Sequence, residues 1–271
     1  MSKEAESLLV LLQDSDPVTQ EKVRVRLEEL GWNAVSYGLQ NLERVIPLPT
    51  RRQVRRRLRE MSSVCAVNEV QALLGEGDSF FVPDGMYSLT RILLPELSPK
   101  EFHDCYMAPA GDLVCELRDT MTAVEKVEML NYIVFDRYGF QLSEDGMDGY
   151  EADILIPDVM AVRKAGVVGI SSVYFLLAGY AGLPVYPVFP REPGYYVAWF
   201  ENGRTLFSMD MGRKGRIADP VPRRSWLDTD FMGTDRTVLY LYATALRRFG
   251  RKPLTPLQAS LLDRAADSLH L

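Results

Sequence analysis

Histidine and cysteine are scarce in this chain of 271 residues, and their scarcity limits the chemistry that it can perform. There are two histidines, of which His270 is the penultimate residue, and three widely separated cysteines. No pair of cysteines has the spacing of metal ligands, so we expect neither a metal site nor a cofactor. Scattered, unpaired thiols are typical of a reducing compartment, and we therefore expect a cytoplasmic protein.

Glycine-rich nucleotide motifs, long apolar runs and an excess of positive charge are missing as well. Neither GxxxxGK[ST] nor GxGxxG occurs in the sequence. The longest apolar run, residues 167–183, is interrupted by glycine, serine and tyrosine and is too short to cross a membrane. A net charge of −6 argues against a general nucleic-acid binder. The composition favours a protein or peptide partner over nucleic acid or membrane.

Helical periodicity dominates the first 76 residues. Leucines recur at helical spacing before Asp16-Pro17, which predicts a capped second helix, and Gly31 separates it from a third helix over residues 32–45. Short helices joined by Asp-Pro and glycine turns are typical of HEAT-like repeats, although a plain helical subdomain explains the pattern equally well. We predict a HEAT-like helical region over residues 1–76 and a second domain over residues 77–271.

The run RRQVRRRLRE, residues 51–60, is the most strongly charged segment. Its apolar residues recur at helical spacing, which predicts an amphipathic helix with an arginine-covered outer face. Such a face either pairs with acidic residues of the same chain or docks an acidic partner or phosphate groups. The residues of the possible docking face are Arg52, Arg55, Arg56 and Arg59.

The second domain is predicted to contain helices first and an antiparallel sheet later, an α+β architecture. The pattern predicts a helix from Pro99 that is interrupted near residues 109–112, a long helix over residues 122–138 and a buried helix after Gly166. Asn202-Gly203 predicts a hairpin between two strands. Papain-like and transglutaminase-like cores have this layout. The predicted elements are helices at 85–94, 157–164, 234–249 and 255–269 and strands at 185–189, 195–201 and 205–210.

Several short motifs occur in the order and spacing of one known family. The segments are GMYSLTR (85–91), LNYIVFDRYGF (130–140), VRKAG (162–166), GLP (182–184), PGYY (193–196) and LFSMD (206–210). Together they resemble the bacterial SirB-type transglutaminase-like family, some members of which also carry an N-terminal HEAT-like segment. The resemblance covers residues 84–216, about half of the chain.

The resemblance implies that the catalytic residues of the family have been replaced here. Transglutaminase-like enzymes have a cysteine in the turn before the buried helix, a histidine on the next strand and an aspartate one strand later. This chain has Val168 at the cysteine position and Tyr195 at the histidine position, and only Asp210 keeps the type of the triad residue. The resemblance therefore implies a degenerate, non-catalytic member that serves as a binding or scaffold module. Its groove would also include Ser171, Ser172 and Tyr196.

Other interpretations of these residues remain open. Asp210, just before Gly212, can be a turn-forming carboxylate, and Ser171 and Ser172 can cap backbone N–H groups of the helix. The alternative function is a cysteine-dependent hydrolase or acyltransferase that uses Cys105 or Cys115.

His103 lies close to Cys105 in the sequence, but residues two apart on a helix do not face each other. These two residues are therefore a poor catalytic pair.

Overall fold

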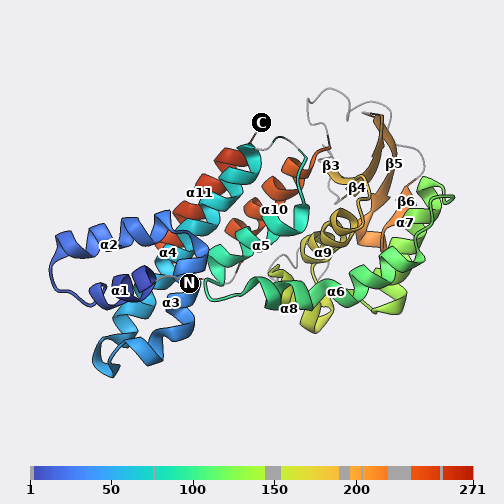
Figure 1. Cartoon of the computed structure of the whole chain (residues 1–271). Helices are drawn as coiled ribbons and strands as arrows, with labels where there is room; N and C mark the ends of the chain where they lie inside the picture. Colours follow the sequence, from blue (N-terminus) through green and yellow to red (C-terminus); the bar gives the residue numbers. More distant parts are fainter. Residues whose placement is uncertain are drawn as a thin grey trace.

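The computed structural model describes residues 3–75, 77, 79–143, 154–188, 196–202, 204–218, 233–250 and 253–270. Helices α1 to α3 lie at one end of the molecule, and a four-stranded sheet lies at the other (Figure 1). The helices of the first half are α1 (Lys3–Leu11), α2 (Pro17–Glu29), α3 (Trp32–Val45), α4 (Leu48–Gly75), α5 (Val82–Leu93), α6 (Pro99–Glu116), α7 (Ala123–Asn131) and the π-helix η1 (Tyr132–Arg137).

The second half contains the strands. Its elements are β1 (Gln141–Leu142), α8 (Ile156–Val162), β2 (Lys164–Ala165), α9 (Val167–Tyr180), β3 (Val185–Val188), β4 (Tyr196–Glu201), β5 (Arg204–Asp210), the short 3₁₀ helix η3 (Met211–Arg213), β6 (Arg216–Ala218), α10 (Asp235–Phe249) and α11 (Pro256–Leu269). Strands β3, β4, β5 and β6 form an antiparallel sheet in that order, and β1 pairs with β2 in parallel. The α+β fold with an N-terminal helical region is confirmed.

The N-terminal helices begin where the local sequence predicts. The Asp16 carboxylate accepts hydrogen bonds from the backbone N–H groups of Val18 (3.2 Å) and Thr19 (2.9 Å) at the start of α2. Gly31, with φ +73°, separates α2 from α3 in a conformation that is strained for residues with a side chain. Helices α1, α2 and α3 pack on one another, and α2 and α3 also pack on α4. The HEAT-like character of this region stays a prediction.

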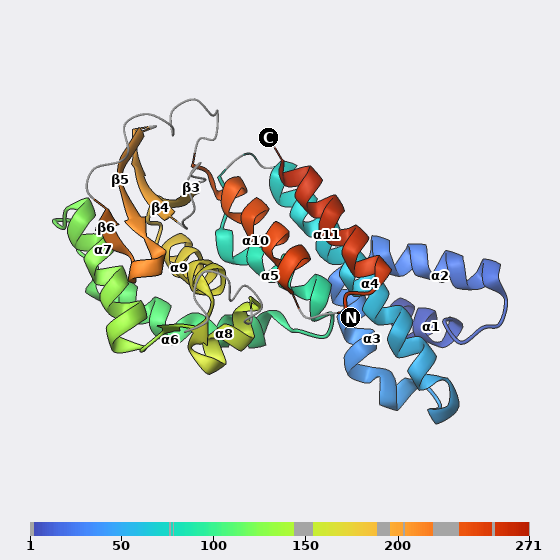
Figure 2. The same cartoon turned by 180° about the vertical axis from the view of Figure 1, so that it is seen from behind.

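Helix α4 contributes side chains to both apolar clusters of the molecule. Its N-terminal part, including Leu58 and Cys65, joins the apolar cluster of α1 to α3, and from Ala66 onward it joins a second cluster formed with the rest of the chain. Seen from behind, α4 lies alongside α11 (Figure 2). The boundary predicted at residue 76 falls at the C-terminal end of α4, whereas the two clusters meet near the middle of this helix.

Helix α9 lies at the centre of the second cluster. Every residue from Val167 to Ala178 is buried, as expected for a helix without a charged side chain. Helices α5, α6, α8 and α10, strand β3 and η3 all pack against it. The sheet and the helices thus surround the element that carries the predicted cysteine position.

One local prediction was wrong, a second was incomplete, and three short strands were missed. Helix α6 continues through Pro109, because Phe102, Tyr106 and Leu113 bury one face of it in the core and this packing outweighs the lost backbone hydrogen bond. The helix predicted over residues 122–138 changes to a π-helix after Asn131. The short strands β1, β2 and β6 were not predicted, since two or three residues are too few to show a period.

Candidate functional site

The N-terminus of α9 presents no reactive group at the family's cysteine position. Gly166 is the N-cap, and Val168 is the second residue of the helix and is 7% exposed. A thiol at this position would lie next to the positive end of the helix dipole, which favours a thiolate. The valine side chain has neither a nucleophilic nor an ionisable atom, so the position itself supplies no chemistry.

Ser171 and Ser172 do not cap the helix, and that prediction was wrong. Their hydroxyl groups donate to the carbonyl oxygens of Val167 (2.7 Å) and Val168 (2.9 Å), one turn earlier in α9. Both serines are one turn past the N-cap, where the backbone N–H groups already have partners within the helix. They are 0% and 4% exposed, so their hydroxyl groups are not presented to solvent. The predicted binding groove stays a prediction.

Asp210 lies at the end of β5, and its carboxylate contacts residues two and three positions later in the chain. Oδ1 accepts a hydrogen bond from the N–H of Gly212 at 2.9 Å, and Oδ2 lies 3.5 Å from Nε of Arg213. Asp210 thereby caps η3, as the turn-forming interpretation predicts.

The neighbouring residue Met209 contacts α9, since its sulfur lies 3.6 Å from the Tyr174 hydroxyl. Asp210 is the last residue of β5, and its carboxylate contacts Gly212 and Arg213. The η3 backbone that follows Asp210 packs against α9. The structure thus brings the segment of Asp210 to α9, while the carboxylate caps η3.

Of the two candidate tyrosines, the structure describes only the backbone of Tyr196. Tyr195, at the predicted histidine position, lies outside the described residues. The backbone of Tyr196 opens β4 and pairs directly opposite Asp210 of β5. The register therefore places the start of β4 beside the strand end that carries the family's aspartate, which is the strand order that the resemblance implies.

A partly buried hydrogen-bond network, which sequence analysis missed, holds this region together. The Tyr174 hydroxyl of α9 donates to Oδ1 of Asn131 at 3.1 Å, and Nδ2 of Asn131 donates to the carbonyl oxygen of Gly215 at 3.0 Å. Burial raises the pKa of Tyr174, which keeps its phenol protonated as a donor. The network ties α7 and α9 to the turn between η3 and β6. Asn131 stands in the LN motif of the resemblance, but that motif alone did not indicate its partners.

The cysteines lie away from the α9 N-terminus in the sequence and differ in environment. Cys65 is buried, and burial raises the pKa of its thiol to about 11. Cys105 donates to the carbonyl oxygen of Phe102, and burial, followed by the charge of Asp104, raises its pKa to about 12. An activated nucleophile requires the opposite shift. Cys115 is exposed near the end of α6.

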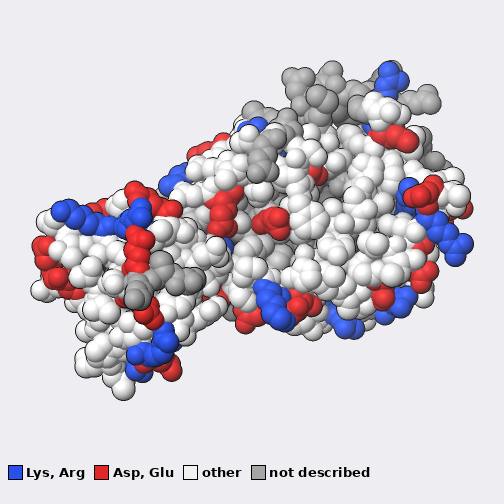
Figure 3. Space-filling view, viewed as in Figure 1, with Lys and Arg blue, Asp and Glu red and all other residues white. Residues whose placement is uncertain are grey.

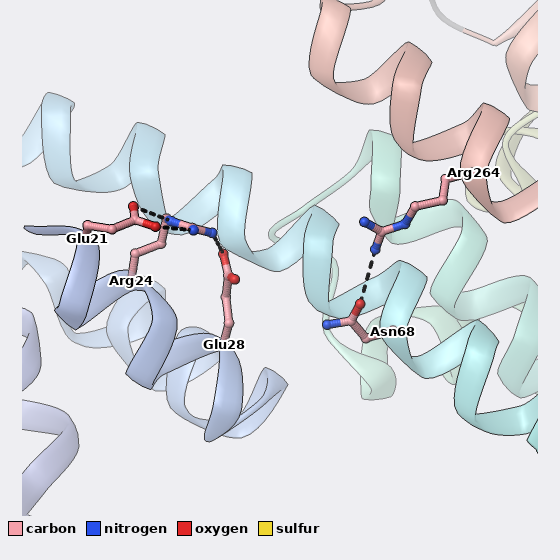
Figure 4. Close-up of polar contacts among 5 residues, drawn as sticks. All are labelled: Glu21, Arg24, Glu28, Asn68 and Arg264. Atoms are coloured by element: carbon pink, nitrogen blue, oxygen red, sulfur yellow. Dashed lines mark hydrogen bonds and ion pairs between the residues drawn. The ribbon is translucent and has the colours of Figure 1, made fainter.

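The predicted arginine face pairs mainly within its own chain. Nε of Arg59 lies 2.7 Å from Glu96, Arg55 lies 3.9 Å from the same carboxylate, and Nε of Arg56 lies 3.0 Å from Glu60. Among the described residues, Arg52 has no such partner. The same internal pairing occurs on α2, where Arg24 contacts both Glu21 and Glu28 (Figure 4).

The described residues contain no group of three or more histidine, cysteine, aspartate or glutamate side chains that could hold a metal ion. Within the same part of the chain, no helix combines the length and the apolarity needed to cross a bilayer.

The comparisons with known proteins agree with this geometry. A family model of the transglutaminase-like superfamily matches residues 107–247, just over half of the chain. The chain belongs to the transglutaminase-like superfamily. The transglutaminase-like part runs from within α6 to within α10 and includes α9, the sheet and the Asn131 network. No curated protein and no solved structure matches the chain.

Proposed function

We propose that this protein is a non-catalytic member of the transglutaminase-like superfamily, of the bacterial SirB type, that acts in the cytoplasm by binding a protein or peptide partner. The observation that carries the proposal is Val168 in the first turn of α9, where the family's thiol would stand. Replacement of the histidine by Tyr195 adds to it, because a phenol with an ordinary pKa near 10 is a poor general base at neutral pH.

The remaining candidate groups support the same proposal. The Asp210 carboxylate is used by Gly212 and Arg213, and Cys65 and Cys105 have thiol pKa values raised by burial. In a subtilisin-type triad, loss of the nucleophile or the base lowers turnover by about 10⁶-fold. A scaffold function requires neither group and is compatible with an apolar α9 N-terminus.

The alternative function is a cysteine-dependent hydrolase or acyltransferase. Cys115 is the stronger candidate for it, because its side chain is exposed whereas burial raises the pKa of Cys105. Site-resolved alkylation of the wild-type chain with iodoacetamide at pH 7 distinguishes the two functions. A non-catalytic protein should show Cys115 reacting no faster than a cysteine in an unfolded peptide, and Cys65 and Cys105 reacting much more slowly.

A cellular experiment provides the matching control. A chain with Cys65→Ala, Cys105→Ala and Cys115→Ser should restore the function in cells that lack the gene, provided that its melting curve matches the wild type. Failure of this folded variant, together with unusually fast alkylation of one cysteine, would establish thiol chemistry and overturn the proposal.

A further inference from the structure

We draw no further inference here: the strongest candidate, the mainly uncharged surface patch where the end of α1, with Leu11 43% exposed, lies beside the start of α4, with Leu48 77% exposed (Figure 3), carries none, because nothing in the part of the chain that the structure describes shows what covers it.

Discussion

The guanidinium carbon of Arg91 lies 4.0 Å from the ring centre of Trp32, although Trp32 packs against the N-terminal apolar cluster and Arg91 lies on α5, whose apolar residues belong to the second cluster. Arg91 is 0% exposed, and its Nη2 lies 2.9 Å from the Glu69 carboxylate of α4. The Tyr87 ring lies on α5 with its centre 5.2 Å from the same guanidinium. A buried cation thus connects the start of α3 with α4 and α5.

Arg91→Met should destabilise the protein, because it removes the charged partner of the Glu69 carboxylate and, within the described part of the chain, leaves it with the Ser88 hydroxyl alone. Loss of one partner of a buried pair costs about 3–5 kcal/mol, and the partial exposure of Glu69 places the expected loss near the lower end. Urea unfolding measures the change. The double variant Arg91→Met, Glu69→Gln should recover part of the loss.

Arg264→Met is the control for this experiment. Arg264 of α11 donates to Oδ1 of Asn68 on α4 at 3.1 Å, but at an exposed position (Figure 4). Its loss should cost less than about 0.5 kcal/mol. Equal effects of the two arginine substitutions would show that burial of Arg91 contributes nothing to the connection.

Introducing the two triad residues that the resemblance implies tests the family geometry directly. If the implied positions are correct, the thiol of Val168→Cys, Tyr195→His lies at a helix N-terminus beside an imidazole, and both features favour the thiolate. Iodoacetamide should modify this cysteine faster than Cys65 or Cys105 at neutral pH, and faster than the cysteine of Val168→Cys alone. If the single and double variants react equally slowly, residue 195 does not reach the α9 N-terminus and the implied triad positions are incorrect.

Asp210 should behave as a turn residue. Asp210→Ala removes the acceptor for the Gly212 N–H and should lower the free energy of unfolding by about 1 kcal/mol, the usual effect of losing such a cap. Asp210→Asn keeps an oxygen acceptor and should cost much less. If Asp210→Asn instead slows alkylation of the double variant Val168→Cys, Tyr195→His without changing stability, the carboxylate acts on the imidazole and the turn interpretation fails.

Gly215 should tolerate no side chain. Its φ is +69°, and an added Cβ would lie 2.2 Å from Oδ1 of Asn131. Gly215→Ala should therefore destabilise the protein by more than 1 kcal/mol, because it strains the backbone and breaks the hydrogen bonds of Asn131. Thermal unfolding checks this, with Gly111→Ala in α6 as a control, since nothing lies within 4 Å of a Cβ there. A similar melting temperature for both variants would show that the Asn131 network is dispensable.

Local features of the chain could be predicted from sequence because their causes are local. Asp16 and Thr122 cap α2 and α7 through side chains that reach their own helix ends, and Asn202 marks the hairpin between β4 and β5. The buried helix after Gly166 was predictable from its mainly apolar composition, which includes no charged residue. The proposed replacement of the family's nucleophile by Val168 likewise rests on the residue type at one position of a motif.

The tertiary structure alone decided which distant groups meet. Arg91 sits in a sequence that suggests an exposed arginine, and only packing between α3, α4 and α5 places it among Trp32, Tyr87 and Glu69. Pro109 lies within a continuous helix because burial of the α6 face outweighs the local penalty of proline. The sequence by itself determined the residue types and the local starts and ends of helices. The contacts between elements were decided by the fold. Which partners a charged side chain has, and how deeply it is buried, depends on all the chain segments that pack around it.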